Sequence, residues 1–342
     1  MDLVALDIGG ANLKLADGQG WVTSHPFPLW KSPGKLAETL AMLLARAPAA
    51  STLAVTMTGE LADCYTTKAE GVREILSAVE SIAHGRPVWV YLTDGSLVSP
   101  EVARQHPMLA AASNWHALAR LAGRFCPAGN GLLIDIGSTT TDLIPLVDGQ
   151  PAAQGRNDPE RMTNQELVYT GVIRSPVCAI RPSVPWRGRM CSVAQELFAT
   201  TLDVYLTLGD LPENPQNNDT ADGKPATRDH ARDRLARTIC ADRDMFSEDD
   251  AERVAGAISA SQMLHLTAAV RSVIERMSYP PNAVVLSGHG EFLARRVLAQ
   301  LAMAPRIVSL AENLGADVTR CAPAHALALL AYELGLQRVR RE

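Results

Sequence analysis

One pattern occurs twice in this chain, and it constrains the fold more than any other feature. Residues 7–19 read Asp-Ile-Gly-Gly-Ala-Asn-Leu-Lys-Leu-Ala-Asp-Gly-Gln, and residues 135–150 read Asp-Ile-Gly-Ser-Thr-Thr-Thr-Asp-Leu-Ile-Pro-Leu-Val-Asp-Gly-Gln. Each copy follows an apolar run and contains a polar turn, a second apolar run and an Asp-Gly turn of the kind that joins antiparallel strands. The repeat predicts two copies of one strand–turn–strand unit that face each other across a cleft.

The polar turn in each copy has the composition of an anion site. A buried strand that ends in such a turn presents backbone N–H groups to a phosphate. The two strands end at Asp7 and Asp135, whose carboxylates would repel a phosphate unless a divalent cation lay between them. Both are therefore predicted metal ligands, with Mg²⁺ as the expected cofactor. The predicted phosphate-binding residues are Gly9, Gly10, Asn12, Lys14, Gly137, Ser138, Thr139 and Thr140.

Two more predicted strands end in groups that carry chemistry. The strand 52–57 leads to Glu60 and Asp63, at the edge where open α/β sheets bind ligands, and both are candidate acid or base groups. A helix N-cap with a first-turn acid is an equally good explanation of this pair. The strand 282–286 leads to His289, a third catalytic candidate, whose glycine neighbours let the backbone lie flat against a ligand. The predicted nucleotide-or-substrate-binding residues there are Ser287, Gly288, Gly290 and Glu291.

The middle of the chain gives less specific signals. Ser192 to Leu208 is predicted to be one helix, with Ser192 and Gln195 in a capping box. Residues 209–228 are rich in Pro, Asn and Asp and favour either a surface loop or a substrate lid. Four arginines lie close together in the sequence: Arg174, Arg181, Arg187 and Arg189. They could form a basic cluster that binds an anionic substrate, or they could be scattered over the surface.

Composition limits the classes of function. A chain of 342 residues can form two domains, each with its own core. The net charge of −5 gives no electrostatic footprint for nucleic acid, and no apolar run is long enough to span a bilayer. The six cysteines are scattered without a Cys-x-x-Cys pair, and no export signal is visible, so a cytoplasmic protein with reduced thiols is expected.

Three motifs in this order resemble the superfamily of acetate and sugar kinases, heat-shock chaperones and actin. Its first phosphate motif is similar to residues 7–12, its second to residues 135–142 and its adenosine motif to residues 286–291. The resemblance covers the whole chain and implies an α/β protein with two ribonuclease-H-like domains flanking a central cleft. The implied domains are residues 1–127 and 128–322, the latter with a helical insertion at about 156–280, and a closing helix, 323–342, that packs back on the first domain.

Within this superfamily, residues 55–63 and 134–142 resemble the hydantoinase and oxoprolinase branch. A narrower group, linked to tetrahydromethanopterin-dependent one-carbon metabolism, is similar at residues 6–14, 113–118, 170–172, 202–205 and 222–225. That group is similar to synthases of methanofuran biosynthesis, which join an aminomethylfuran-methyl diphosphate to γ-glutamyltyramine. The resemblance implies a transferase that forms an aryl-alkyl ether and releases diphosphate, with these two small molecules as its partners.

Under this reading the phosphate turns and Mg²⁺ would bind the leaving diphosphate, and Glu60, ahead of Asp63 or His289, would take the phenol proton. A second reading keeps the same motifs for ATP, in a small-molecule kinase or an ATPase of the hydantoinase and oxoprolinase type. A third is a nucleotide-dependent switch that acts on a protein partner. The sequence makes no prediction about the oligomeric state.

Overall fold

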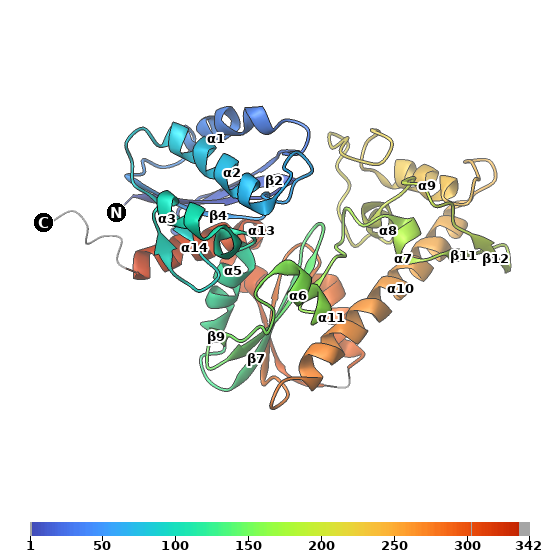
Figure 1. Cartoon of the computed structure of the whole chain (residues 1–342). Coiled ribbons are helices and arrows are strands. Elements are labelled where there is room, and N and C mark those ends of the chain that lie inside the picture. Colours follow the sequence, from blue (N-terminus) through green and yellow to red (C-terminus); the bar gives the residue numbers. More distant parts are fainter. Residues whose placement is uncertain (1, 302, 335–342) are drawn as a thin grey trace, which may run out of the picture.

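The computed structural model describes residues 2–301 and 303–334, and two mixed sheets carry the repeated pattern (Figure 1). The first sheet has the strand order β3-β2-β1-β4-β5-β6. Its strands are β1 (Leu3–Ile8), β2 (Asn12–Ala16), β3 (Val22–Pro26), β4 (Thr52–Met57), β5 (Val88–Tyr91) and β6 (Leu97–Val98). The second sheet has the order β10-β8-β7-β13-β14, with β9 beside β8. Its strands are β7 (Asn130–Ile136), β8 (Thr141–Val147), β9 (Gln150–Pro151), β10 (Leu167–Val168), β13 (Ala283–Ser287) and β14 (Arg306–Ser309).

The two sheets repeat one topology. In each, three antiparallel strands are extended by strands parallel to the first, β4 and β5 beside β1, and β13 and β14 beside β7. The Asp-Gly turns that follow β2 and β8 have the backbone that the sequence predicts, because Gly18, Asp148 and Gly149 have φ values of 75°, 48° and 75°. The predicted duplication and the predicted α/β class are therefore confirmed.

Alternate residues of β1 and β7 face different cores, which places the helices in layers. Val4 and Leu6 of β1 pack with α1 (Leu36–Leu44) and α2 (Lys68–Ala83), on one outer side. Leu132 of β7 packs with α10 (Glu248–Glu275) and α11 (Glu291–Ala299), on the other. Leu3 and Leu133 point inward, to a core that α5 (Asn114–Gly123) and α14 (Ala322–Glu333) share. Both sheets thus enclose the same pair of helices.

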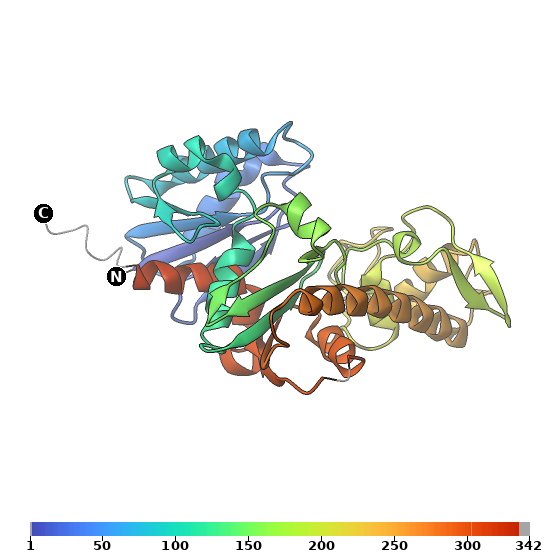
Figure 2. The ribbon, with the colours of Figure 1, turned by 60° about the horizontal axis from the view of Figure 1, so that its bottom comes forward.

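The alanine-rich closing helix lies against the first sheet. α14 contacts β1, β2 and β4, and Figure 2 shows it running along these strands. Gly18 is required at this contact, because a Cβ there would lie 3.0 Å from the Ala328 Cβ and the backbone has positive φ. The expected closing helix extended to residue 342, but residues 335–342 lie outside the described part of the chain.

Residues 156–280 contain strands as well as helices. A lateral lobe, residues 175–258, projects from the side of the second sheet (Figure 1). The segment begins with α6 (Asp158–Thr163), and β10 then completes the second sheet. The lobe contains α7 (Val177–Ile180), β11 (Ser183–Trp186), β12 (Arg189–Ser192), α8 (Thr201–Thr207), α9 (Arg228–Arg237) and the first part of α10.

The prediction of one helix from Ser192 to Leu208 is wrong. Ser192 pairs with Ser183 in the β11–β12 hairpin, so its backbone is extended rather than helical. Helix α8 begins only at Thr201, where Thr200 and Asp203 form the capping box. The Pro- and Asn-rich segment 209–228 folds against α9, because Asp222 pairs with Arg234 at 3.0 Å and with Arg237 at 3.1 Å.

The remaining helices are short. They are the 3₁₀ turn Pro33–Lys35, α3 (Pro100–Gln105), α4 (Pro107–Ala110), α12 (Leu310–Leu314) and α13 (Ala316–Arg320). Among the described residues, no helix combines the length and the apolar character needed to cross a lipid bilayer.

Candidate functional site

The polar ends of β1, β7 and β13 meet between the two sheets. Asp7 faces Lys14 across the β1–β2 hairpin, and the Lys14 Nζ lies 3.9 Å from the Asp7 Oδ2. Asp135 faces Ser287 in the parallel pair of β7 and β13. Lys14 perturbs the pKa values of Asp7, Asp135 and His289, so its charge acts on all three strand ends. The structure therefore brings together predicted residues that are far apart in the sequence.

The two predicted metal ligands are buried carboxyls with raised pKa values. Burial raises the pKa of Asp135 to about 6, with repulsion from Asp142 adding to it and Ser287 and Lys14 opposing it. Burial also raises the pKa of Asp7, which Lys14 only partly offsets. One Asp7 oxygen, Oδ1, has no hydrogen-bond partner among the described residues. A cation that neutralises both carboxylates would relieve this cost.

The donor set suits a hard divalent cation that keeps much of its water. Two carboxylates supply only oxygen ligands, which Mg²⁺ prefers. Among the described residues, no three His, Cys, Asp or Glu side chains converge as a metal site. A closed site of the zinc type thus has no basis in the described residues, whereas Mg²⁺ bound through Asp7, Asp135 and water is compatible with this geometry.

The two predicted phosphate turns have the same internal hydrogen bond. The Gly9 N–H donates to the Asn12 carbonyl at 3.0 Å, and the Gly137 N–H donates to the Thr140 carbonyl at 2.9 Å. These two glycines therefore hold the shape of the turns. The backbone N–H groups that donate to no group of the described residues, and so remain available to an anion, include those of Gly10, Ser138 and Thr139.

Residues 171–174 brace the second turn, a role that was not predicted. The N–H groups of Ile173 and Arg174 donate to the Ser138 carbonyl at 3.1 and 2.9 Å. Gly171 lies so close that a Cβ there would be 2.5 Å from the Thr139 nitrogen. The signal in the sequence was the family-like stretch 170–172, whose position against the turn could not be read from its composition.

The end of β13 is packed tightly against β7. A Cβ on Gly288 would lie 2.3 Å from the Ile136 carbonyl oxygen, and the Gly290 N–H donates to the same oxygen at 2.9 Å. The Glu291 carboxylate accepts from Arg295 and from Ser309. Burial, with Lys14 and Arg320 adding to it, lowers the pKa of His289 to about 4, so its imidazole is neutral near pH 7.

Glu60 and Asp63 lie in different environments. Glu60 is 1% exposed, and burial raises its pKa to about 7, although Lys68 opposes the shift. Its Oε2 has no partner among the described residues, whereas Asp63 is exposed to solvent. The alternative of a helix N-cap is wrong for this pair, because Thr67 caps α2 by accepting from the Glu70 N–H.

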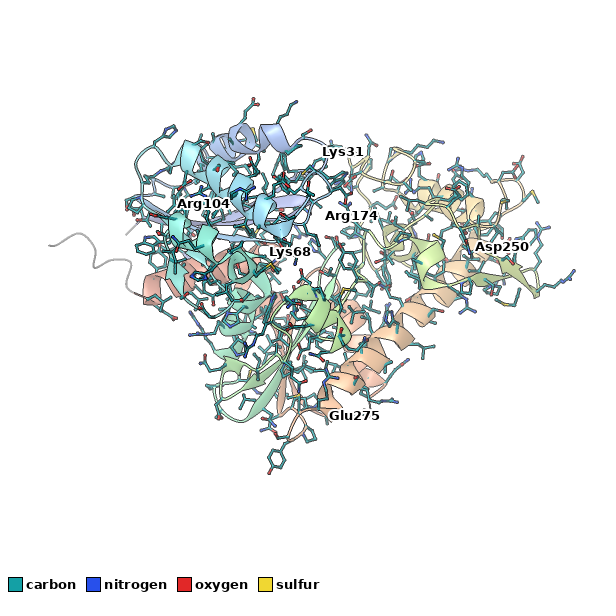
Figure 3. The ribbon with its side chains drawn as sticks, in the orientation of Figure 1. Lys31, Lys68, Arg104, Arg174, Asp250 and Glu275 are labelled. Atoms are coloured by element: carbon teal, nitrogen blue, oxygen red, sulfur yellow. The ribbon has the colours of Figure 1, made fainter. Side chains whose placement is uncertain are left out.

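A chain of charges connects Glu60 to the second sheet and was not predicted. The Lys68 Nζ lies 3.8 Å from the Glu60 Oε1 and 2.6 Å from the Asp158 Oδ2. Arg161 follows Asp158 on α6 and binds Asp142 of β8 at 2.5 Å. Figure 3 labels Lys68, which lies next to the helix labelled α6 in the same orientation in Figure 1. Lys68 and Asp158 are 90 residues apart, so no local pattern could pair them.

The four predicted arginines do not act together. Arg181 donates to Ser261 of α10 at 2.8 Å, and Arg187 stacks on Trp186 and donates to the Met245 carbonyl within the lateral lobe. Arg189 lies exposed on the β11–β12 hairpin. Of the four, only Arg174 points toward the part of the molecule that contains the first sheet (Figure 3). Its guanidinium lies 4.8 Å from the centre of the Trp30 ring.

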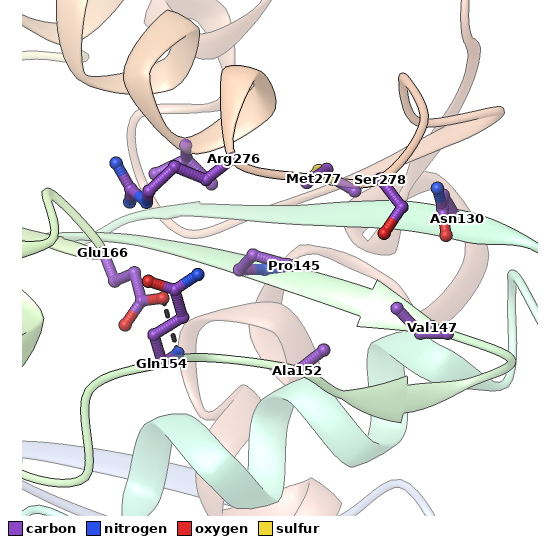
Figure 4. Close-up of a pocket in the computed structure, with 10 residues that line it drawn as sticks. Asn130, Pro145, Val147, Ala152, Gln154, Glu166, Arg276, Met277 and Ser278 are labelled. Carbon is purple, nitrogen blue, oxygen red and sulfur yellow. Dashed lines mark hydrogen bonds between the residues drawn. The ribbon is translucent and has the colours of Figure 1, made fainter.

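A pocket of about 160 Å³ lies between the end of α10 and the β7–β9 strands (Figure 4). Glu166 in its wall is already satisfied, because its two oxygens accept from the Gln154 and Gly155 N–H groups at 2.7 and 2.9 Å. Its lining contains none of the predicted site residues: Asn130, Pro145, Val147, Ala152, Gln154, Glu166, Val273, Arg276, Met277 and Ser278.

Comparison with solved structures agrees with this fold. A nucleotide-free acetone carboxylase, from a study of ATP-dependent acetone carboxylation, superposes with a TM-score of 0.55 at 13% identity. The match covers 96% of this chain and 70% of the carboxylase chain. At that identity the likeness shows the fold alone.

Sequence comparison extends over nearly the whole chain. The (4-{4-[2-(gamma-L-glutamylamino)ethyl]phenoxymethyl}furan-2-yl)methanamine synthase of Methanocaldococcus jannaschii is 34% identical over 331 residues, 96% of this chain and 97% of that protein. The synthase of the same name from Methanococcus vannielii is 32% identical over 203 residues, 59% of this chain and 90% of that protein. The hydantoinase/oxoprolinase family matches residues 51–333. The chain belongs to the hydantoinase/oxoprolinase family, as the resemblance in its sequence predicted.

Proposed function

We propose that this protein forms the aryl-alkyl ether of a methanofuran-type cofactor, by joining an aminomethylfuran-methyl diphosphate to the phenol oxygen of γ-glutamyltyramine. The observation that carries the proposal is the 34% identity to the Methanocaldococcus jannaschii synthase over nearly the full length of both chains. The compound in that protein's name has a phenoxy oxygen bonded to a methylene group on a furan ring. The precursors of this bond are therefore a phenol and a furan-methyl carbon that carries a leaving group.

The proposed reaction is a substitution at the furan-methyl carbon. The bond between this carbon and the diphosphate oxygen breaks, and its electron pair leaves with the diphosphate. The furan ring oxygen stabilises the positive charge on the carbon, and the phenol oxygen forms the new bond. The phenol proton passes to a base. The reaction therefore needs donors for diphosphate, a base for the phenol and protection from water, which would otherwise attack the same carbon.

The strand ends between the two sheets offer the first of these requirements. The unused N–H groups of Gly10, Ser138 and Thr139 and the Lys14 ammonium would bind the diphosphate oxygens. Asp7 and Asp135 would hold Mg²⁺ through water, and this ion would neutralise charge that develops on the leaving group. The raised pKa values of both carboxyls and the unpartnered Asp7 oxygen support a cation at this place.

Glu60 is the base that we propose for the phenol. The reference pKa of a phenol is about 10, so a base with a pKa near neutrality accepts its proton more readily than an ordinary carboxylate does. Burial raises the pKa of Glu60 to about 7, and its Oε2 has no hydrogen bond to lose. His289, with a pKa lowered to about 4, is the weaker base, and Asp63 faces solvent.

The decisive experiment supplies purified protein and Mg²⁺ with ATP, with the furan diphosphate, with γ-glutamyltyramine, or with the two organic substrates together. Diphosphate release that requires both organic substrates, with the ether detected by mass spectrometry, is the expected result. Phosphate release from ATP without ether formation would overturn the proposal and favour an ATP-dependent kinase or ATPase instead.

A further inference from the structure

Lys68 is the one described cation that contacts the Glu60 carboxylate, and it contacts a second carboxylate more closely. Its ammonium lies 2.6 Å from Asp158 and 3.8 Å from Glu60. Lys68 is 13% exposed and Glu60 1%, so solvent screens the three charges weakly. The ammonium is thus shared unequally between a carboxylate of α6 and the proposed base.

Helix stability does not explain a lysine at this position. Lys68 is the first residue of α2, which Thr67 caps. The positive end of the helix dipole lies at this terminus and disfavours a cation there. The two carboxylates offset this cost, so the reason for Lys68 lies in its partners rather than in α2.

Asp158 is held in place by the second sheet. It is the first residue of α6, and Arg161, one turn later, binds Asp142 of β8 at 2.5 Å. The Arg161 guanidinium also stacks on Trp115 of α5, 4.2 Å from the ring centre. β8 and α5 therefore fix α6, and through it the carboxylate that competes with Glu60 for Lys68.

We infer that Lys68 and Asp158 are positioning residues for Glu60: Asp158 takes the close contact with Lys68, which keeps the ammonium near Glu60 without occupying the oxygen that receives the phenol proton. The unpartnered Glu60 Oε2 is the geometric consequence. This inference rests on the proposed function in giving Glu60 the role of the base. Its electrostatic part concerns Glu60 alone and can be measured without any reaction.

Three charged or polar groups from three elements act on Glu60. Burial has the largest effect and raises its pKa, and Asp158 of α6 raises it further, whereas Lys68 of α2 and the backbone of Ala112 before α5 lower it. Loss of the Lys68 charge should therefore raise the pKa of Glu60. Loss of the Asp158 charge should lower it, both by removing repulsion and by releasing Lys68 to approach Glu60. Shifts of the Glu60 pKa in opposite directions, on loss of the Lys68 charge and on loss of the Asp158 charge, would identify this arrangement of the three residues.

The test measures the pKa of Glu60 directly by carbon NMR on protein labelled with δ-¹³C glutamate, the signal being identified by its loss in Glu60→Gln. We expect Lys68→Met to raise the pKa and Asp158→Asn to lower it, each by about one unit. Matched controls are Arg232→Met and Asp222→Asn, because Arg232 is 17% exposed and Asp222, like Asp158, is 21% exposed, and both form ion pairs in the lateral lobe. Neither control should move the Glu60 signal.

The pH profile of ether formation gives the second readout. The acid limb of kcat/KM should move up in Lys68→Met and down in Asp158→Asn, and the charge-conserving Lys68→Arg and Asp158→Glu should stay near the wild-type profile. If either substitution prevents folding, the remaining variant still tests the sign of the shift. Shifts in the same direction, or none, would overturn the inference.

The two proposals fail in different ways. A wild-type protein that makes no ether, but whose Glu60 signal shifts in opposite directions in the two variants, would overturn the proposed function and leave the electrostatic arrangement established. A wild-type protein that makes the ether, with a Glu60 pKa indifferent to both substitutions, would overturn the positioning role alone.

Discussion

Two glutamates show how differently this protein buries the same side chain. Glu60 and Glu166 are each 1% exposed. Both oxygens of Glu166 accept backbone N–H groups, whereas the Glu60 Oε2 accepts none among the described residues. A buried carboxylate oxygen without a hydrogen bond costs stability, and such a cost persists where function needs the group. Glu166 thus has a structural role, whereas the environment of Glu60 agrees with the role of base that we propose for it.

This contrast predicts an unusual stabilising substitution. Because the pKa of Glu60 is raised from 4.5 to about 7, the folded state binds more protons than the unfolded state between these values. Stability therefore falls as pH rises through this window, by about 3 kcal/mol in total. Glu60→Gln should remove ether formation and, in urea unfolding, stabilise the protein at pH 8 but not at pH 4.5. Glu166→Gln, the matched control, should destabilise the protein at both pH values.

A lower stability of Glu60→Gln at pH 8 would show that the carboxylate is structural, and Glu60 would lose its role as the base. The sequence singled out Glu60 because it follows a strand. It placed Glu60 ahead of Asp63 as the base, but it did not give the physical difference between them, which is the burial of Glu60 against α2. It also gave no sign of Lys68 and Asp158, whose meeting depends on the packing of two sheets.

The metal assignment has its own test. Asp7→Asn and Asp135→Asn conserve the shape of the side chains, so both proteins should fold, yet Mg²⁺ binding measured by calorimetry should weaken at least tenfold and turnover should be lost. Asp148→Asn is the control, because Asp148 is exposed at the far turn of the second hairpin and asparagine tolerates its φ of 48°. Unaltered Mg²⁺ binding in the two site variants would overturn the assignment.

At the scale of elements, the sequence predicted structures that depend on neighbouring residues, but not structures that depend on pairing between distant residues. The Asp-Gly turns predicted the β2–β3 and β8–β9 hairpins because a turn of this type depends on adjacent residues. The two-residue strand β10 escaped prediction, since only its pairing with Thr141 and Asp142 makes it a strand. The helix expected from Ser192 failed for the same reason, because β11 recruits Ser192 into a hairpin.

Helix α2 touches the candidate base through a glycine, and this predicts opposite effects of one substitution in two helices. A Cβ on Gly71 would lie 2.1 Å from the Glu60 carbonyl oxygen, whereas a Cβ on Gly256 of α10 would meet nothing within 4 Å. Gly71→Ala should destabilise the protein by about 1–3 kcal/mol and reduce turnover, because α2 and Glu60 must separate. Gly256→Ala should stabilise it by about 0.5–1 kcal/mol through helix propensity. Thermal unfolding of both variants decides the matter, and equal effects would contradict this packing.

At the scale of the whole molecule, the two sheets are joined by a common core. α14 contacts β1 and β4, α5 contacts β7 and β8, and the two helices contact each other. The sequence predicted two similar sheets because the same strand–turn–strand pattern occurs in it twice. The shared core was less accessible, since alanine-rich helices fit against many partners and their sequence does not say which.

A shared core predicts coupled stability. Leu327 of α14 is fully buried in this core, so Leu327→Ala should cost about 2–5 kcal/mol. Hydrogen exchange should show a similar loss of protection in β1 and β7. Leu40→Ala provides the comparison, because Leu40 is equally buried but packs only in the core between α1, α2 and the first sheet. A loss confined to β1 in Leu327→Ala would show that the sheets unfold independently.

The stacking of Arg174 on Trp30 has a kinetic consequence. Arg174 is tied to the second phosphate turn through the Ser138 carbonyl, and Trp30 belongs to the first sheet's side of the molecule. Any rotation that parts the two sides at this rim must break the contact, at a cost of about 0.5–2 kcal/mol. The residence time of a bound ligand would then depend on how long this Arg174–Trp30 contact persists. Arg174→Ala should therefore increase the rate of product release by up to about thirtyfold, without changing the rate of bond formation.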